Sequence, residues 1–261
     1  MPDAQSIKKL IESSGNNFHA KVARWFSSSG WHVVVSPYYV DQAQSKSREL
    51  DLIAEKTVPI RDGFDRVQGH LVARLFIECK YINEEAVFWF APKDIDCATN
   101  LITRGGPFKE RNTYTQKHHY LSQSKDVAKL FASGNSSRVN ENDPIFKALN
   151  QVLNGFVALR RRPPFHPDVQ VKGSRKIVAI EFPVIVFSSF SKLYSTEFLT
   201  ETEPKPISEN FQLEVRYAFE GKEGHQVSEY FLLDIIDFEQ LDLFEKAIDE
   251  DANAAAYLSS D

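Results

Sequence analysis

The sequence predicts an α/β fold in which a mixed central sheet is flanked by helices. Three observations predict it. Residues 16–28 repeat apolar side chains at helical spacing. Several short β-type runs separated by turn residues follow between residues 31 and 82. A second helical pattern at 145–159 precedes a near-continuous apolar run at 176–187, which is typical of a buried central strand.

The N-terminal elements follow from breakers and periodicity. Gly15 separates two helices, expected over residues 5–13 and 16–28, and Gly30 is placed to end the second one. Trp31 to Val40 reads as the first strand. The elements expected next are a polar turn at 42–47, a strand at 49–56, a loop or exposed hairpin at 57–70 and a strand at 71–82.

The rest of the chain mixes helices and strands. Pro144 suits the first turn of the helix that follows it. The elements expected are an edge strand at 87–90, a helix at 114–132, polar stretches at 133–142 and 188–210, strands at 212–219 and 230–236, a closing helix at 238–249 and a frayed tail at 250–261. In the 212–219 strand, Leu213, Val215, Tyr217 and Phe219 are expected to face inward and Gln212, Glu214 and Arg216 outward. We expect one domain over 1–261, with a core at about 16–187 and an extension of the sheet at about 188–250.

Two of the expected strands carry charged residues where a buried strand is normally apolar. Asp51 is followed at once by Leu52-Ile53-Ala54. Glu78 and Lys80 lie two residues apart, so the period of a strand places both on one face. Charged groups are costly to bury unless they are paired or bind a metal. Adjacent strands that bring these three side chains together predict a site for a divalent cation and a water.

This set of groups suits metal-assisted hydrolysis of a phosphodiester. Asp51 and Glu78 supply the hard oxygen ligands that Mg²⁺ or Mn²⁺ prefers. The Cys79 backbone carbonyl is a third candidate ligand, because its side chain should point to the opposite face. Lys80 would orient or deprotonate the attacking water, or hold the scissile phosphate. The alternative is an internal salt-bridge cluster without catalysis.

A helix, a strand, a strand ending in Asp51 and a strand that carries Glu78-Cys79-Lys80 resemble the PD-(D/E)xK nuclease superfamily, which includes Mrr-type enzymes and archaeal Holliday-junction resolvases. The resemblance covers roughly residues 16–132. A further helix and the strand at 176–187 would complete the αβββαβ core of the restriction-endonuclease-like fold. The resemblance implies a Mg²⁺-dependent deoxyribonuclease with Asp51, Glu78 and Lys80 in the catalytic positions.

The chain departs from the superfamily pattern in its first helix. Relatives often carry a Glu after a Phe there, whereas His19 follows Phe18 in this sequence. Glu12 could substitute for that Glu, and Glu49 shares a face with Asp51, so these three residues are auxiliary candidates. A solvated surface role is the alternative for His19 and Glu49.

Two groups of residues are candidates for substrate contacts. Gln116 and Tyr120 match the Gln-x-x-x-Tyr pattern of RecB-like exonucleases, in which the two residues contact DNA near the active site. Arg160-Arg161-Arg162 follow the helix at 145–159 and would either cap its C-terminus or hold backbone phosphates. His118 and His119 lack the spacing of a zinc site.

Composition limits the partners. The 261-residue chain has a net charge of −5, so binding to nucleic acid would need a local basic face. Two cysteines and no signal-peptide or membrane-spanning pattern predict a cytoplasmic protein. DNA is the expected partner, with a homodimer or a larger protein complex left open. The alternative function is a catalytically silent nucleic-acid-binding or scaffold subunit of a defence, repair or mobile-element complex.

Overall fold

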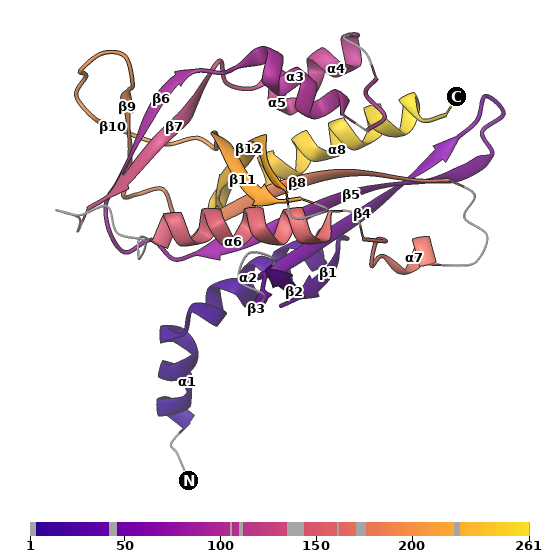
Figure 1. Ribbon diagram of the computed structural model, residues 1–261. Helices are drawn as coiled ribbons and strands as arrows, with labels where there is room; N and C mark the ends of the chain where they lie inside the picture. Colours follow the sequence, from indigo (N-terminus) through magenta and orange to yellow (C-terminus); the bar gives the residue numbers. More distant parts are fainter. Residues whose placement is uncertain are drawn as a thin grey trace.

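A mixed β-sheet organises the chain (Figure 1). The computed structural model describes residues 4–41, 46–104, 106–109, 112–134, 144–160, 162–170, 176–221 and 225–260. Within these ranges the sheet has ten strands, in the order β1 (His32–Val35), β4 (Leu52–Arg61), β5 (Val67–Lys80), β8 (Ile177–Phe187), β12 (Gln226–Asp237), β11 (Phe211–Glu220), β7 (Asp126–Ser133), β6 (Ala86–Pro92), β9 (Leu193–Glu197) and β10 (Lys205–Pro206). The prediction of an α/β fold with a mixed sheet is confirmed.

Helices cover both faces of this sheet (Figure 1). The helical segments are α1 (Ala4–Ser13), α2 (Gly15–Ser28), α3 (Ile95–Thr103), α4 (Thr113–Lys117), α5 (His119–Ser122), α6 (Pro144–Leu159), α7 (Pro167–Gln170), a short 3-10 helix (Phe238–Gln240) and α8 (Leu241–Leu258). One hydrophobic core lies under α2 and α8. The other lies under α6, where every third or fourth residue is apolar and buried. None of the described helices is both long and apolar enough to cross a membrane.

The N-terminal strands differ from the prediction in one respect. The expected strand at 31–40 is two strands, because the backbone turns at Ser36, where φ is 53°. Its second half, β2 (Tyr38–Asp41), pairs with β3 (Lys46–Glu49) in a separate two-stranded sheet. Of the two alternatives expected at 57–70, a loop or an exposed hairpin, the structure has a hairpin between β4 and β5.

The pairing around β5 defines the centre of the molecule. β1, β4 and β5 pair antiparallel in sequence, and β8 pairs parallel to β5 without a break from His70–Ile177 to Lys80–Phe187. The crossover to a parallel strand needs a long connection, and it contains α6. α2, β1, β4, β5, α6 and β8 thus follow one another in the order αβββαβ, with further elements between them.

The predicted helix at 114–132 is wrong. Only α4 and α5 are helical there, and the chain then forms strand β7, which pairs with both β6 and β11. A strand forms here in place of the expected helix because Val127 and Ala128 fill the core between these neighbours. β6 also pairs with β9, so it is not an edge strand as expected, and the connection at 188–210 contains β9 and β10. Gln212, expected to face outward, is buried because both faces of β11 are covered there.

The predicted fraying of residues 250–261 is also wrong. α8 continues to Leu258 and buries Asp251, Ala252, Ala255 and Ala256 against the sheet. The small alanine side chains allow close approach of the helix, and Asp251 binds a buried histidine pair described below.

We expect a chain that ends at Glu250 to lose at least about 3 kcal/mol of unfolding free energy, because it leaves buried His119 without one of its carboxylate partners. Chemical denaturation of this variant and of the full chain would measure the loss. A chain that ends at Ser259 is the control and should match the full chain. Equal stability of all three would show that the last turns of α8 contribute nothing.

Candidate functional site

The structure brings Asp51, Glu78 and Lys80 together at the point where β4 begins and β5 ends. Leu52 pairs with Ile77, so Asp51 lies beside the last residues of β5. The Cys79 amide donates a hydrogen bond to Asp51 Oδ2 over 2.8 Å. This bond fixes the Asp51 carboxylate against the end of β5, next to Glu78.

Glu78 is a buried carboxyl group whose negative charge is offset by few neighbouring groups. Its exposed fraction is 0%, and Lys80 Nζ lies 3.2 Å from its Oε2. No described group donates a hydrogen bond of good geometry to either of its carboxylate oxygens. Burial, and then the negative charge of Asp51, raise the pKa of Glu78 to about 8, although Lys80 opposes the shift. Near neutral pH the site therefore favours a proton, or a cation, on this group.

Lys80 has a second partner that sequence reasoning missed. Gln151 Oε1 lies 3.3 Å from Lys80 Nζ, and the Tyr39 hydroxyl donates to the Gln151 backbone carbonyl over 3.3 Å. Gln151 lies on the buried side of α6, between Ala148 and Gly155. A polar residue on an apolar helix face is the sequence signal that could have identified it.

The auxiliary candidates differ in their positions. His19 of α2 reaches the site, with its Nε2 3.3 Å from Asp51 Oδ2. Glu49 lies at the end of β3, where hydrogen bonds from the Ser36 and Tyr38 hydroxyls lower the pKa of its carboxyl group. Glu12 belongs to α1, but its side chain lies outside the described part of the structure.

The structure does not bring Gln116 and Tyr120 to this site. Gln116 is exposed on α4, and Tyr120 is only 3% exposed, in the core under α8. The Tyr120 hydroxyl donates to the Leu232 carbonyl over 3.0 Å. Glu78 belongs to the opposite face of the sheet, so the expected substrate contacts of this pair are corrected to a structural role for Tyr120.

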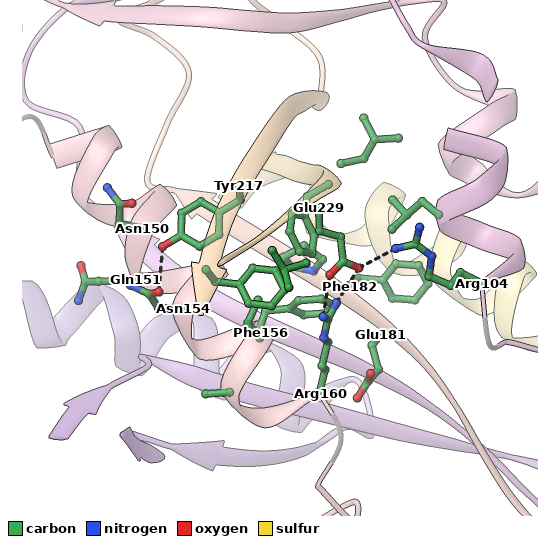
Figure 2. A pocket seen from close by; sticks show the side chains of 18 of the residues that line it. Arg104, Asn150, Gln151, Asn154, Phe156, Arg160, Glu181, Phe182, Tyr217 and Glu229 are labelled. Carbon is green, nitrogen blue, oxygen red and sulfur yellow. Dashed lines mark hydrogen bonds and ion pairs between the residues drawn. The ribbon is translucent and has the colours of Figure 1, made fainter. Parts of the chain in front are cut away.

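A groove of about 1500 Å³ extends along α6 from Gln151 (Figure 2). It exists because β8 and β12 pair only over Val184–Phe187 and Asp234–Asp237, so that their N-terminal halves diverge. Pro183 lies where this ladder stops and has no N–H to donate. Asn154 faces Tyr217 across the groove, with 2.8 Å between the Tyr217 hydroxyl and Asn154 Oδ1.

The arginine run has mainly structural contacts. Arg160 lines the groove and forms a bidentate ion pair with Glu229 at 2.8 and 3.0 Å, while Arg104 approaches the same carboxylate at 3.5 Å (Figure 2). The Arg162 carbonyl accepts from buried Arg74. Arg161 lies outside the described residues. The Arg160 guanidinium is therefore engaged in an ion pair, whereas the side chain of Arg162 is exposed.

A second charged cluster lies on the other face of the sheet. Buried His119 joins Asp251, through Nδ1 at 2.5 Å, to Asp234, through Nε2 at 3.1 Å. His118 Nδ1 accepts from the Tyr120 amide and lies 3.2 Å from Asp251. His118, His119 and Asp251 are close enough to hold a metal ion, but the carboxylates of Asp234 and Asp251 are already offset by the His119 imidazolium and the buried Lys93 ammonium.

The two histidines of this cluster titrate in opposite directions. Burial opposes a charge on His119, but Asp234 and Asp251 outweigh it and raise its pKa to about 10. Burial lowers the pKa of His118 to about 3. His119 therefore carries the positive charge that ties α5 to β12 and α8.

Comparison with protein-family models, with curated proteins and with solved structures found no match to this chain.

Replacing His119 by Gln should remove a pH-dependent part of the stability. The folded pKa is raised, so the stabilisation by His119 is complete below about pH 6.5 and is lost as pH rises through about 10. Denaturant unfolding of wild type and variant at pH 6 and pH 10.5 should show the difference between them shrinking by a few kcal/mol, on the order expected from linkage. A constant difference would contradict a charged His119.

Glu78→Gln should show a pH dependence of the same sign in a lower pH window. The folded carboxyl group keeps a proton that the unfolded chain releases, so the wild type loses stability relative to the variant as pH rises from about 4.5 to about 8. Metal-free protein would be unfolded by denaturant at several pH values. Glu203→Gln, at an exposed position, is the matched control and should follow the wild type at every pH. A difference in unfolding free energy between wild type and Glu78→Gln that does not change with pH would show that the pKa of Glu78 is not raised.

Proposed function

We propose that this chain is a divalent-metal-dependent nuclease that hydrolyses phosphodiester bonds, with DNA as the expected substrate. The observation that carries the proposal is the Glu78 carboxyl group, which is buried beside Asp51 without a hydrogen-bond donor of good geometry in the described structure. Buried carboxylates are normally hydrogen-bonded, paired or bound to a metal. A pair of them that lacks full compensation is what a cation site requires.

The order of elements supports the same proposal. The resemblance to the PD-(D/E)xK superfamily implies an αβββαβ core, and α2, β1, β4, β5, α6 and β8 follow that order. Asp51 lies directly before β4 rather than at the end of a strand, but it is still next to Glu78 and Lys80 at the end of the paired strand β5. The crossover helix α6 then brings Gln151 to Lys80.

The residues present fit a hard divalent ion. Asp51 and Glu78 offer carboxylate oxygens, and the Cys79 carbonyl faces the same side as its amide, which donates to Asp51. When bound, Mg²⁺ or Mn²⁺ would polarise the scissile phosphate and lower the pKa of a water. The cation binds to the deprotonated form of Glu78, so the fraction of protein with a bound cation should increase as pH rises toward 8.

The protein groups would act as follows in hydrolysis. The oxygen of a water forms a bond to phosphorus, and the bond from phosphorus to the leaving oxygen breaks in line with it. Lys80, held by Glu78 and Gln151, would donate hydrogen bonds to the non-bridging phosphate oxygens as negative charge develops there. Tyr39 holds the backbone of Gln151 and so helps to fix the Lys80 ammonium.

The alternative, a silent nucleic-acid-binding or scaffold subunit, also has an observation in its favour. Glu78 is fully buried and within ion-pair distance of Lys80. The two side chains could therefore serve only as an internal salt bridge, without catalysis, in the same fold. Such a protein would bind nucleic acid or a protein partner without needing a divalent ion.

Lys80→Ala should lower cleavage of supercoiled plasmid and of end-labelled single-stranded DNA by roughly 100-fold or more, because a group that stabilises the transition state is lost. The assay compares Mg²⁺ and Mn²⁺ with EDTA. Lys205→Ala, at an exposed position of β10, is the matched control and should cleave like the wild type.

The outcomes separate the alternatives. Metal-dependent cleavage lost only in Lys80→Ala supports the nuclease. Metal-independent binding of DNA with no cleavage by any variant would favour the silent subunit. Equal cleavage by wild type and Lys80→Ala would mean that the site is wrongly placed.

A further inference from the structure

His19 adds a nitrogen donor to a site that otherwise offers only oxygen ligands. It projects from α2, whose buried residues Phe18, Val22 and Phe26 anchor the helix on the sheet. Its side chain is 28% exposed, so the ring lies at the boundary between the site and solvent. Among the described residues, Asp51 is the acidic group within ion-pair distance of this ring.

The distance between the two groups fits joint coordination of one ion. Adjacent ligands of an octahedral cation with bonds of about 2.1 Å lie about 3 Å apart, and tetrahedral ligands lie slightly farther apart. The separation of His19 Nε2 and Asp51 Oδ2 is 3.3 Å. Asp51 Oδ2 also accepts the Cys79 amide, which leaves a second lone pair of that oxygen for a cation.

The kind of donor determines which cations the site prefers. Mg²⁺ takes oxygen ligands, whereas imidazole suits the first-row transition metals, whose affinities increase from Mn²⁺ upward. Carboxylate and carbonyl oxygens accept both classes. One imidazole among oxygen ligands should therefore shift the preference from Mg²⁺ toward Mn²⁺ without excluding Mg²⁺.

We propose that His19 is a ligand of the site and makes it bind Mn²⁺ in preference to Mg²⁺. The proposal rests on the proposed function, since it assumes that Asp51 and Glu78 bind a cation. It assigns α2 a direct role in the site, in addition to its role in covering the sheet.

The test measures binding and the ligand atom rather than cleavage. Isothermal titration of the full chain with Mn²⁺ and with Mg²⁺ gives the ratio of the two dissociation constants. Pulsed electron paramagnetic resonance of the Mn²⁺-loaded protein detects a nitrogen nucleus bound to the ion. The variants are His19→Gln, His19→Glu and, as a matched control at an exposed histidine, His225→Gln.

We expect the wild type and His225→Gln to bind Mn²⁺ at least about ten-fold more tightly than Mg²⁺, and to give a nitrogen signal. His19→Gln should lose the signal and most of the preference. His19→Glu should lose the signal but retain an oxygen ligand, and so bind Mg²⁺ better than His19→Gln does.

Two results would overturn the proposal in different ways. Binding of Mn²⁺ without a nitrogen signal, or with an unchanged preference in His19→Gln, would exclude His19 as a ligand and leave the nuclease proposal standing. Absence of binding of either ion to the wild type would overturn both. Thermal unfolding of each metal-free variant checks that the substitution has not disrupted α2.

Discussion

The central constraint on this molecule is the burial of β5 on both faces and along both edges. β4 pairs with one edge of β5 and β8 with the other, and helices cover both faces. A strand in this position must compensate every charged side chain that it carries. β5 carries Arg74 and Glu78 on the same face, and the protein treats the two in different ways.

Arg74 forms an ionic network with two carboxylates and a backbone carbonyl. Its Nε lies 2.6 Å from Glu55 of β4, its Nη1 lies 3.0 Å from Glu181 of β8, and the Arg162 carbonyl accepts from the same Nη1. The His166 amide satisfies the second oxygen of Glu55. Two carboxylates thus share one guanidinium at the middle of the sheet. This network gives each of its two carboxylates a cationic partner, although Arg74 Nη2 has no hydrogen-bond partner among the described residues, and it ties together the three strands that support the site.

Glu78, four residues farther along the same face, lacks such a network. Its neighbours are Asp51, which repels its charge, and Lys80, which is also drawn toward Gln151. The difference between the two positions is a matter of register, because Arg74 lies opposite β4 whereas Glu78 lies beyond its first residue. The site therefore lies where the pairing of β4 with β5 ends, and the partly exposed side chains of Lys80 and His19 connect it to solvent.

Sequence reasoning found the residues whose signal is local. Asp51, Glu78 and Lys80 are charged residues next to or within apolar strands; β-periodicity placed Glu78 and Lys80 on one face, and the expected pairing of adjacent strands added Asp51. It failed where the partner is distant in sequence. Tyr120 and the strand at 126–133 are fixed by β11, β12 and α8, and Asp251 is buried by a histidine pair more than a hundred residues away. Gln151 stands out in the sequence as a polar residue on the apolar face of α6, but its contact with Lys80 follows only from the packing of α6 on β5.

The charge of the two clusters on opposite faces of the sheet gives the last argument for a cation. Around His119, the carboxylates of Asp234 and Asp251 are balanced by the imidazolium and by the buried Lys93 ammonium, which lies close enough to feel Asp234. Around Glu78, two carboxylates face one ammonium, so the group carries one uncompensated negative charge when both are ionised. The raised pKa of Glu78 means that a proton neutralises this charge near neutral pH in the absence of a cation. A divalent ion would replace that proton and remove the repulsion between Asp51 and Glu78. The first cluster is balanced by its own side chains, whereas the second is balanced by a proton or, on the proposed function, by a cation, and this difference is the physical basis for proposing a function for the second.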